Sequence, residues 1–239
     1  GIAPLSKWHK TKGKWLLHVS MVPAILSVVL SALVFTFHEF DLYLWLSFAI
    51  ALWLVLMVIR DWFDKVLKTR VSILTRARKL PRQYYGMLLA HLGVAVTLIG
   101  IIFVSMNSSE VAVRMGPGDK VDLGAYTFEF EQTRHIEGPN YIADTAFINV
   151  YKGDRKIAQM RPQKRMYQAS QQVMTEAALN PGFTRDLYIS LGEKLDQDTW
   201  SVRIYIKSFV RWLWLGGLLM MAGGLLAAGD KRYRRKIGE

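Results

Sequence analysis

The chain has 239 residues, 51% of them hydrophobic, and a formal net charge of +12; its length allows one or two domains. It contains no cysteine, which excludes disulfides, thiolate nucleophiles and cysteine-held iron–sulfur sites within it. In a soluble protein this charge would suggest nucleic-acid binding, but 17 of the 31 Lys and Arg lie in residues 1–14, 60–82 and 229–239, beside apolar segments. Such clusters mark the cytoplasmic side of membrane spans, so we expect membrane lipid and no nucleic acid as a partner.

The N-terminal part predicts a basic segment followed by a membrane hairpin. Residues 1–14 form a basic cytoplasmic segment, and 15–37 form the first predicted span, with Pro23 as a kink whose freed carbonyl a neighbour must satisfy. Residues 42–59 form the second span, which returns the chain to the cytoplasmic side. Because the chain starts at Gly1 and shows no signal-peptide pattern, we expect a fragment or processed piece of a longer protein.

A basic cytoplasmic connection leads to the third predicted span. Residues 60–82 carry aromatic side chains among charges, which is typical of an amphipathic segment lying on anionic lipid. Residues 84–106 hold no Asp, Glu, Lys or Arg and are long enough to cross a hydrocarbon layer about 30 Å thick. A stripe of small residues at helical spacing predicts close packing against a neighbouring helix. It consists of Gly86, Ala90, Gly93, Thr97 and Gly100.

His91 lies within the third span, roughly opposite that stripe, which predicts an inner helix with two protein-facing surfaces. One interpretation is a structural histidine, hydrogen-bonded to the next helix, an interaction worth about 1 kcal/mol. The other is a ligand, because ionisable residues within membranes are costly and neutral imidazole is a common axial ligand of haem iron. Ala95, one turn further, would leave room for a flat macrocycle. His18 is either an interfacial histidine or a second ligand at the depth of His91. The residues leave both questions open.

Between residues 108 and 207 the pattern changes from helical to alternating. Six segments have the composition, and several the period of two, that predict strands. They are residues 111–115, 126–131, 146–151, 156–160, 185–190 and 201–207. Gly, Pro and Asn separate them, so we expect a small antiparallel barrel or sandwich over residues 108–207, on the outer side of the membrane.

The C-terminal part predicts a fourth span, residues 209–228, and a basic cytoplasmic tail, residues 229–239. Four crossings place both ends inside. The predicted fold class is therefore an α-helical polytopic membrane protein of four transmembrane helices with an inserted all-β periplasmic domain.

A basic run in this β-region, MRPQKRMY, carries Arg161, Lys164 and Arg165. These cations are either candidates for contacts with carboxylates, such as haem propionates or those of a partner, or members of a solvated loop. We interpret His135 as an ordinary surface residue in a loop. Dinucleotide-binding, phosphate-loop and HExxH patterns are absent from the sequence, which argues against an independent soluble enzyme.

Several longer motifs carry a family resemblance. YYGMLLAHLGVAV, GPNYIADTA, MRPQKRMY, VMTEAALNPGFTRDLYISLGE and YIKSFVRWLWLGGLLMMAGG resemble, in order and spacing, the C-terminal portion of the CcmF family with its NrfE-type relatives. These are the haem lyase subunits of bacterial cytochrome c maturation. The resemblance implies a polytopic inner-membrane protein that receives haem on the periplasmic side and helps join it to the thiols of an apocytochrome CxxCH site.

The resemblance also implies a role for His91. In the family, the histidine of the YYGM…AHLG helix is an axial ligand of a membrane-embedded haem b, which passes electrons from quinol to the haem being attached. The family's second ligand, its tryptophan-rich segment and two outer-face histidines are missing here, so the substrate haem would be held mainly by other parts, and this chain alone is not expected to catalyse ligation.

The implied partners are the N-terminal part of the lyase, other maturation subunits, apocytochrome c and a haem-delivery chaperone. Two alternatives stay open. In one, the chain is a non-catalytic membrane scaffold whose β-domain docks apocytochrome or other maturation subunits. In the other, His18 and His91 bind haem within this chain.

Overall fold

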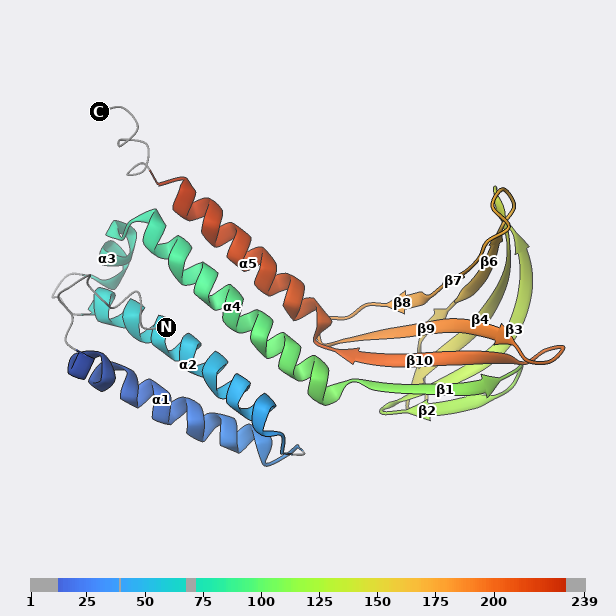
Figure 1. Ribbon diagram of the computed structural model, residues 1–239, viewed down its shortest axis with the longest axis horizontal. Coiled ribbons are helices and arrows are strands. Elements are labelled where there is room, and N and C mark those ends of the chain that lie inside the picture. The colour runs from blue at the N-terminus through green and yellow to red at the C-terminus, as the bar shows by residue number, and fades with distance from the viewer. Residues whose placement is uncertain (1–12, 39, 68–71, 231–239) are drawn as a thin grey trace. The chain divides into compact units, whose positions relative to one another are not determined.

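A computed structural model describes residues 13–38, 40–67 and 72–230 of the chain. The described residues form five helices and ten strands (Figure 1). They divide into two compact units: the first comprises Gly1–Ile102 with Arg211–Glu239, and the second is Phe103–Val210.

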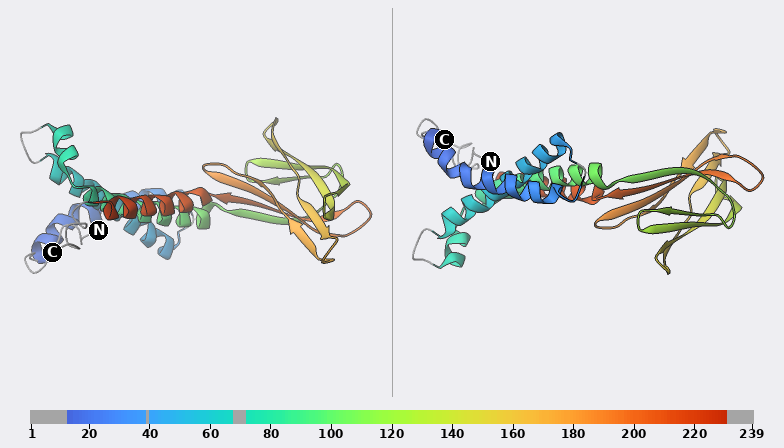
Figure 2. Two further views of the ribbon diagram at one scale, coloured as in Figure 1. Left: turned by 90° about the horizontal axis from the view of Figure 1, so that it is seen from above. Right: turned by 90° about the horizontal axis from the view of Figure 1, so that it is seen from below.

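The first unit is helical. Its helices are α1 (Gly13–Phe35), α2 (Leu42–Leu67), α3 (Ile73–Lys79), α4 (Arg82–Asn107, of which the last residues belong to the second unit) and α5 (Val210–Ala228). All but the short α3, which projects to one side of the long helices (Figure 2), are long and apolar enough to cross a membrane. The sequence therefore predicted the four membrane-crossing helices of the described chain.

Helix α2 is longer than the predicted span, because it continues eight residues beyond Ile59. Two ion pairs at helical i, i+4 spacing lie in this extension, Arg60 with Asp64 and Lys65 with Asp61. Such pairs stabilise a helix. The first part of the predicted connection is consequently helical.

The kink residue of α1 has the partner that the sequence required. Pro23 lies inside α1 and supplies no N–H, which leaves the carbonyl of Val19 without its usual helical donor. Arg60 of α2 donates from Nη1 to that carbonyl. A guanidinium from the neighbouring helix thus satisfies the freed oxygen, as a membrane helix with an internal proline needs.

Helix α4 packs between α2 and α5 (Figure 1). A Cβ added at Gly93 would lie 2.6 Å from the carbonyl oxygen of Gly216, and one added at Gly223 would lie 2.7 Å from the backbone nitrogen of Ala90. The predicted small-residue stripe therefore faces α5 with the backbones in near contact. On its other side α4 contacts α2, where Val58, Tyr84 and Leu88 form a buried cluster. The prediction of an inner helix is confirmed.

The second unit is a β-sandwich of two antiparallel sheets (Figure 1). One has the order β1-β10-β9-β8, and the other β2-β3-β4-β6-β7 with β5 also paired to β4. The strands are β1 (Ser109–Met115), β2 (Lys120–Leu123), β3 (Tyr126–Glu137), β4 (Tyr141–Lys152), β5 (Arg155–Met160), β6 (Gln163–Tyr167), β7 (Val173–Glu176), β8 (Ala178–Asn180), β9 (Arg185–Lys194) and β10 (Trp200–Ser208). Alternate residues such as Phe128, Ile148 and Ile204 fill the core between the sheets.

All six predicted strands lie within observed strands, whereas β2, β6, β7 and β8 were not predicted. These four are only three to five residues long, so they carry too few residues for a visible alternation. Two interpretations are corrected as a result. Lys164 and Arg165 of the basic run lie in β6 and not in a loop, whereas Arg161 lies in the two-residue connection between β5 and β6; His135 lies in β3, where its Nδ1 is 3.0 Å from Asp144 Oδ1.

Candidate functional site

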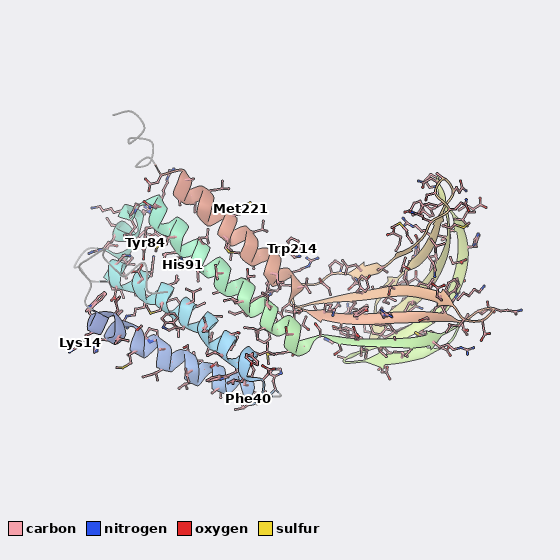
Figure 3. All side chains as sticks on the ribbon, in the orientation of Figure 1. Lys14, Phe40, Tyr84, His91, Trp214 and Met221 are labelled. Atoms are coloured by element: carbon pink, nitrogen blue, oxygen red, sulfur yellow. The ribbon has the colours of Figure 1, made fainter. Side chains whose placement is uncertain are left out.

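His91 lies in the first half of the apolar part of α4, two turns after Tyr84 (Figure 3). Its side chain is half-buried. Its Nδ1 is 2.8 Å from the carbonyl oxygen of Met87, one turn earlier. Because a carbonyl only accepts, Nδ1 is the protonated nitrogen and donates this bond. The lone pair of the neutral ring is then on Nε2, which is the arrangement that a metal-ligating histidine needs.

Space beside the imidazole is restricted on one side. Ala95, which the sequence analysis assigned as room for a flat macrocycle, is fully buried at 0% exposure. Protein atoms already fill that position, so the expectation of free space at Ala95 is wrong.

An apolar groove lies on the neighbouring face of the same helix. It has a volume of about 450 Å³ and is lined by α4 residues and by side chains of α2 and α5. The lining residues are Val58, Ile59, Trp62, Phe63, Tyr85, Leu88, Leu89, Leu92 and Leu226. His91 is not among them, although it directly precedes Leu92 in the helix.

A buried carboxylate joins α2 to α4 two turns before His91. Asp61 is 3% exposed, and its Oδ2 accepts hydrogen bonds from the hydroxyl of Tyr84 at 2.7 Å and from Lys65 Nζ at 2.8 Å. The Lys65 ammonium also lies 4.1 Å from the centre of the Tyr84 ring. A buried charge is tolerated only when it is paired and hydrogen-bonded, and here both partners are present. This cluster fixes α4 against α2 and so helps to hold His91 in place.

The structure separates His18 from His91 by a helix. His18 is an exposed residue of α1, which contacts α2 through Arg60 and Val19. Figure 1 shows α2 between α1 and α4. Within the described ranges, no cluster of three or more His, Asp or Glu side chains could hold a metal ion. The structure therefore does not bring His18 and His91 together.

The basic run of the β-unit is divided between two faces of one sheet. Arg161 and Arg165 lie on its outer face, where Arg165 stacks on Tyr141 with 4.3 Å from Cζ to the ring centre. Lys164 lies on the opposite face, and its Nζ donates to the carbonyl of Gly192 at 3.2 Å and to Glu193 Oε1 at 2.5 Å. The three cations therefore do not form one cluster, and Lys164 already has a carboxylate partner.

A second polar group occupies the other end of the same outer face. The hydroxyl of Tyr151 donates to Glu129 Oε2 at 2.8 Å, and Lys120 Nζ lies 3.1 Å from Glu129 Oε1. The bond from Tyr151, followed by that from Lys120, holds the pKa of the Glu129 carboxyl below its ordinary value. The same bond raises the pKa of the Tyr151 hydroxyl.

The sequence did not predict Asp61 or Tyr84 as members of a polar cluster, nor Arg134 of β3, whose Nε donates to Gln132 at 3.2 Å and whose guanidinium stacks on Phe147. Asp61 stood in a segment that its charges marked as an exposed connection, and Tyr84 stood where interfacial aromatics are common. The i, i+4 spacing of Asp61 and Lys65 was a usable signal for a continued helix. No local pattern indicated which strand would lie beside Arg134.

Comparison with known proteins agrees with this architecture. The family described as "CcmF C-terminal beta-sandwich" matches residues 106–208. The chain is 44% identical over 237 residues to the "Cytochrome c-type biogenesis protein CcmF" of Pseudomonas aeruginosa, covering 99% of this chain and 36% of that protein. It is 38% identical over 239 residues to the CcmF protein of Escherichia coli K12, again covering 99% of this chain and 36% of that protein. The NrfE protein of Haemophilus influenzae is 35% identical over 166 residues, covering 70% of this chain and 26% of that protein.

A solved structure titled "Cytochrome c Heme Lyase CcmF" has the same fold, with a TM-score of 0.76 and 18% identity, covering 94% of this chain and 36% of that one. Apolar helices with an inserted β-sandwich define a multi-pass membrane protein. The chain belongs to the CcmF and NrfE family of cytochrome c-type biogenesis proteins and corresponds to the family's C-terminal region. It spans about a third of the length of the CcmF relatives it matches.

Proposed function

We propose that this chain contributes the C-terminal part of a cytochrome c haem lyase and supplies His91 as an axial ligand of a membrane-embedded haem b. The observation that carries the proposal is the bond from His91 Nδ1 to the Met87 carbonyl, which leaves Nε2 as the unprotonated nitrogen within an apolar helix. An intramembrane histidine is costly, and His91 forms no ion pair with any residue that the structure describes, which makes it a candidate ligand.

The protein residues around His91 fit such a group. His91 would hold the iron, Met87 would fix the tautomer and orientation of the ring, and the Asp61–Tyr84–Lys65 cluster would fix the helix that carries both. A haem bound at this position would supply one-electron chemistry, with a potential that depends on its ligands and burial. We propose that quinol is the electron donor and that the haem being attached is the acceptor. Parts of the assembly outside this chain would hold the substrate haem.

The proposed topology follows from the charge clusters. We place the chain in the bacterial inner membrane, with both termini and residues 60–82 in the cytoplasm and the β-sandwich in the periplasm. The partners that we propose are the N-terminal part of the lyase, other maturation subunits, apocytochrome c and a haem-delivery chaperone. Ligation requires these parts, so this chain alone is expected to be inactive.

The test is the absorbance of the embedded haem in the complete assembly. His91→Ala should remove that absorbance, because Ala offers no ligand, while the assembly still forms. His18→Ala is the matched control, since His18 is exposed on another helix, and it should leave the spectrum unchanged. Full haem content in the His91 variant would defeat the assignment.

The competing proposal that His18 and His91 both bind haem within this chain gives a different result. It requires haem to copurify with the isolated chain and His18→Ala to reduce its content. An isolated chain that stays colourless after exposure to haem would count against it.

A docking role for the β-sandwich is the second candidate function, and it does not exclude the first. Two exposed arginines on the outer face of the six-stranded sheet favour it. Each is oriented by a hydrogen bond to a glutamine side chain and so can meet a partner protein. Deleting the β-sandwich should then abolish binding of the other subunits or apocytochrome, whereas His91→Ala should leave that binding intact.

A further inference from the structure

Three Gln–Arg pairs lie on the outer face of the six-stranded sheet, in the part of the chain that the structure describes. In each pair the guanidinium Nε donates to the side-chain oxygen of the glutamine two residues earlier. The distances are 3.2 Å for Gln132 and Arg134, 3.3 Å for Gln159 and Arg161, and 2.8 Å for Gln163 and Arg165. Residues i and i+2 of a strand share a face, so each glutamine can orient its arginine.

The strand register brings these pairs into a continuous surface. Met160 of β5 lies opposite Ile148 of β4, and Gln163 of β6 lies opposite Thr145, so β5 and β6 follow β4 in a single register. The outer face along β5 and β6 consequently reads Gln159, Arg161, Gln163, Arg165, Tyr167. Arg134 stands on the far side of β4, in β3, opposite Thr145.

Aromatic rings form the floor beneath the guanidinium groups. Phe147 is 8% exposed, and its ring centre lies 5.3 Å from Arg134 Cζ and 5.0 Å from Arg161 Cζ. Tyr141 lies beneath Arg165 in the same way. Stacking on a ring and bonding to a glutamine leave the remaining N–H groups of Arg134 and Arg161 for an external acceptor, whereas Arg165 also lies beside Glu176.

The charges on this surface are not neutralised equally. Arg165 has Glu176 within 3.8 Å, but no described carboxylate lies within 4 Å of Arg134 or Arg161, and both are exposed. Glu129 accepts a hydrogen bond from Tyr151, and Glu131 accepts from Asn149 and from Gln159, the glutamine that also accepts from Arg161. The surface therefore presents two unpaired, oriented guanidinium groups.

We propose that this face, defined by Arg134, Arg161 and Arg165 with Phe147 and Tyr141, docks an acidic, extended segment of a partner protein. The guanidinium fork matches a carboxylate with two parallel hydrogen bonds. This inference names the surface and the partner chemistry for the docking role proposed above, and it does not depend on haem ligation by His91.

An acidic protein segment fits the surface better than an anionic membrane does. Arg161 and Arg165 stand four residues apart along one strand direction, or about 13 Å. Carboxylates at positions i and i+4 of an extended segment have the same spacing. The aromatic rings of Phe147 and Tyr141 lie beneath the arginines and do not project outward for insertion into lipid.

Binding of a labelled peptide to the full chain in detergent tests the proposal. The probe is a fluorescein-labelled decapeptide of alternating Glu and Ser, with a Gln-for-Glu peptide as the negative control. Arg134→Gln combined with Arg161→Gln should weaken binding at least about tenfold, because two charge-assisted contacts are lost. Arg203→Gln removes an exposed cation from β10 of the other sheet and should change affinity less than about twofold, because surface charges away from the site act weakly.

Further measurements separate geometry from net charge and from lipid binding. Arg161→Lys keeps the charge but loses the Nε bond to Gln159, so it should bind more weakly than the unaltered chain. Far-UV circular dichroism checks the fold of each variant. If a variant unfolds, peptide binding to the unaltered chain is measured in about 0.5 M NaCl instead. Loss of binding there supports a charge-assisted contact, and undiminished binding contradicts it. Equal weakening by Arg203→Gln, equal binding of the Gln peptide, or preferential binding of anionic phosphatidylglycerol vesicles through the same arginines would overturn the proposal.

His91→Ala should leave peptide binding unchanged, so failure of the docking proposal does not bear on the haem proposal.

Discussion

At the scale of single residues, hydrogen bonds from backbone and side-chain groups determine what each polar side chain can do. The Met87 carbonyl determines the tautomer of His91, and Arg60 replaces the donor that Pro23 lacks. In both cases a polar group inside an apolar helix has a partner, as the low dielectric of the membrane requires. Removing such a partner should therefore lower the free energy of unfolding.

Tyr84→Phe should destabilise the helical unit. The substitution removes the 2.7 Å bond to the buried carboxylate of Asp61, and a hydrogen bond to a charged group is worth about 1.5–3 kcal/mol. Thermal unfolding in detergent measures the loss. Tyr43→Phe is the matched control, because Tyr43 is 81% exposed and should change stability by less than about 0.5 kcal/mol. Equal stability of the two variants would show that the Asp61–Tyr84 bond contributes nothing.

Glu129 should make the β-sandwich sensitive to acid. Its pKa in the folded chain is below the ordinary value of 4.5, so its contribution to stability is present above that value and is lost as the pH falls through the folded pKa. Glu129→Gln should therefore flatten the decline of the melting temperature below pH 4.5, measured by circular dichroism. An unchanged slope in that variant would contradict the assignment. Glu110→Gln, on the other sheet, is the control.

At the scale of elements, the close approach of the α4 and α5 backbones determines which glycines can be substituted. Gly216 faces Gly93 and Thr97, whereas its neighbour Gly217 has open space at the position of a Cβ. Small residues at helical spacing permit this approach, which a methyl group on the contact face would prevent. Gly216 should therefore not tolerate a larger side chain, whereas the adjacent Gly217 should.

Gly216→Ala should separate the two helices or strain them, at a cost of about 1–3 kcal/mol. Gly217→Ala should be neutral or slightly stabilising, because it adds helix propensity without a clash. Unfolding of both variants in detergent, followed by Trp fluorescence, provides the comparison. If Gly217→Ala were the more damaging variant, the packing of α4 on α5 would be wrong.

The elements that could be predicted from the sequence are those whose burial produces a regular pattern. The membrane helices, the small-residue stripe and the longer strands have apolar periods that follow directly from which face is buried. The short strands β6 and β7 are stabilised by pairing with neighbours and have no such period. The Gln–Arg surface depends on which strands lie side by side, and the pairing of Asp61 with Tyr84 depends on how α2 meets α4. Neither is encoded locally.

At the scale of the whole molecule, the chain combines a helical unit that contains one candidate metal ligand with a β-sandwich that presents a basic face. It spans about a third of the length of the CcmF relatives that it matches, and within the described ranges no group of three or more His, Asp or Glu side chains could hold a metal ion. The haem ligation and the docking that we propose both involve parts of an assembly beyond this chain.

A structure of the complete, haem-containing assembly is the most direct measurement of the central claim. We predict iron bonded to Nε2 of His91, with Nδ1 still donating to the carbonyl of Met87. An imidazole that contacts only side chains or lipid, with the membrane haem held entirely by other residues, would contradict the account.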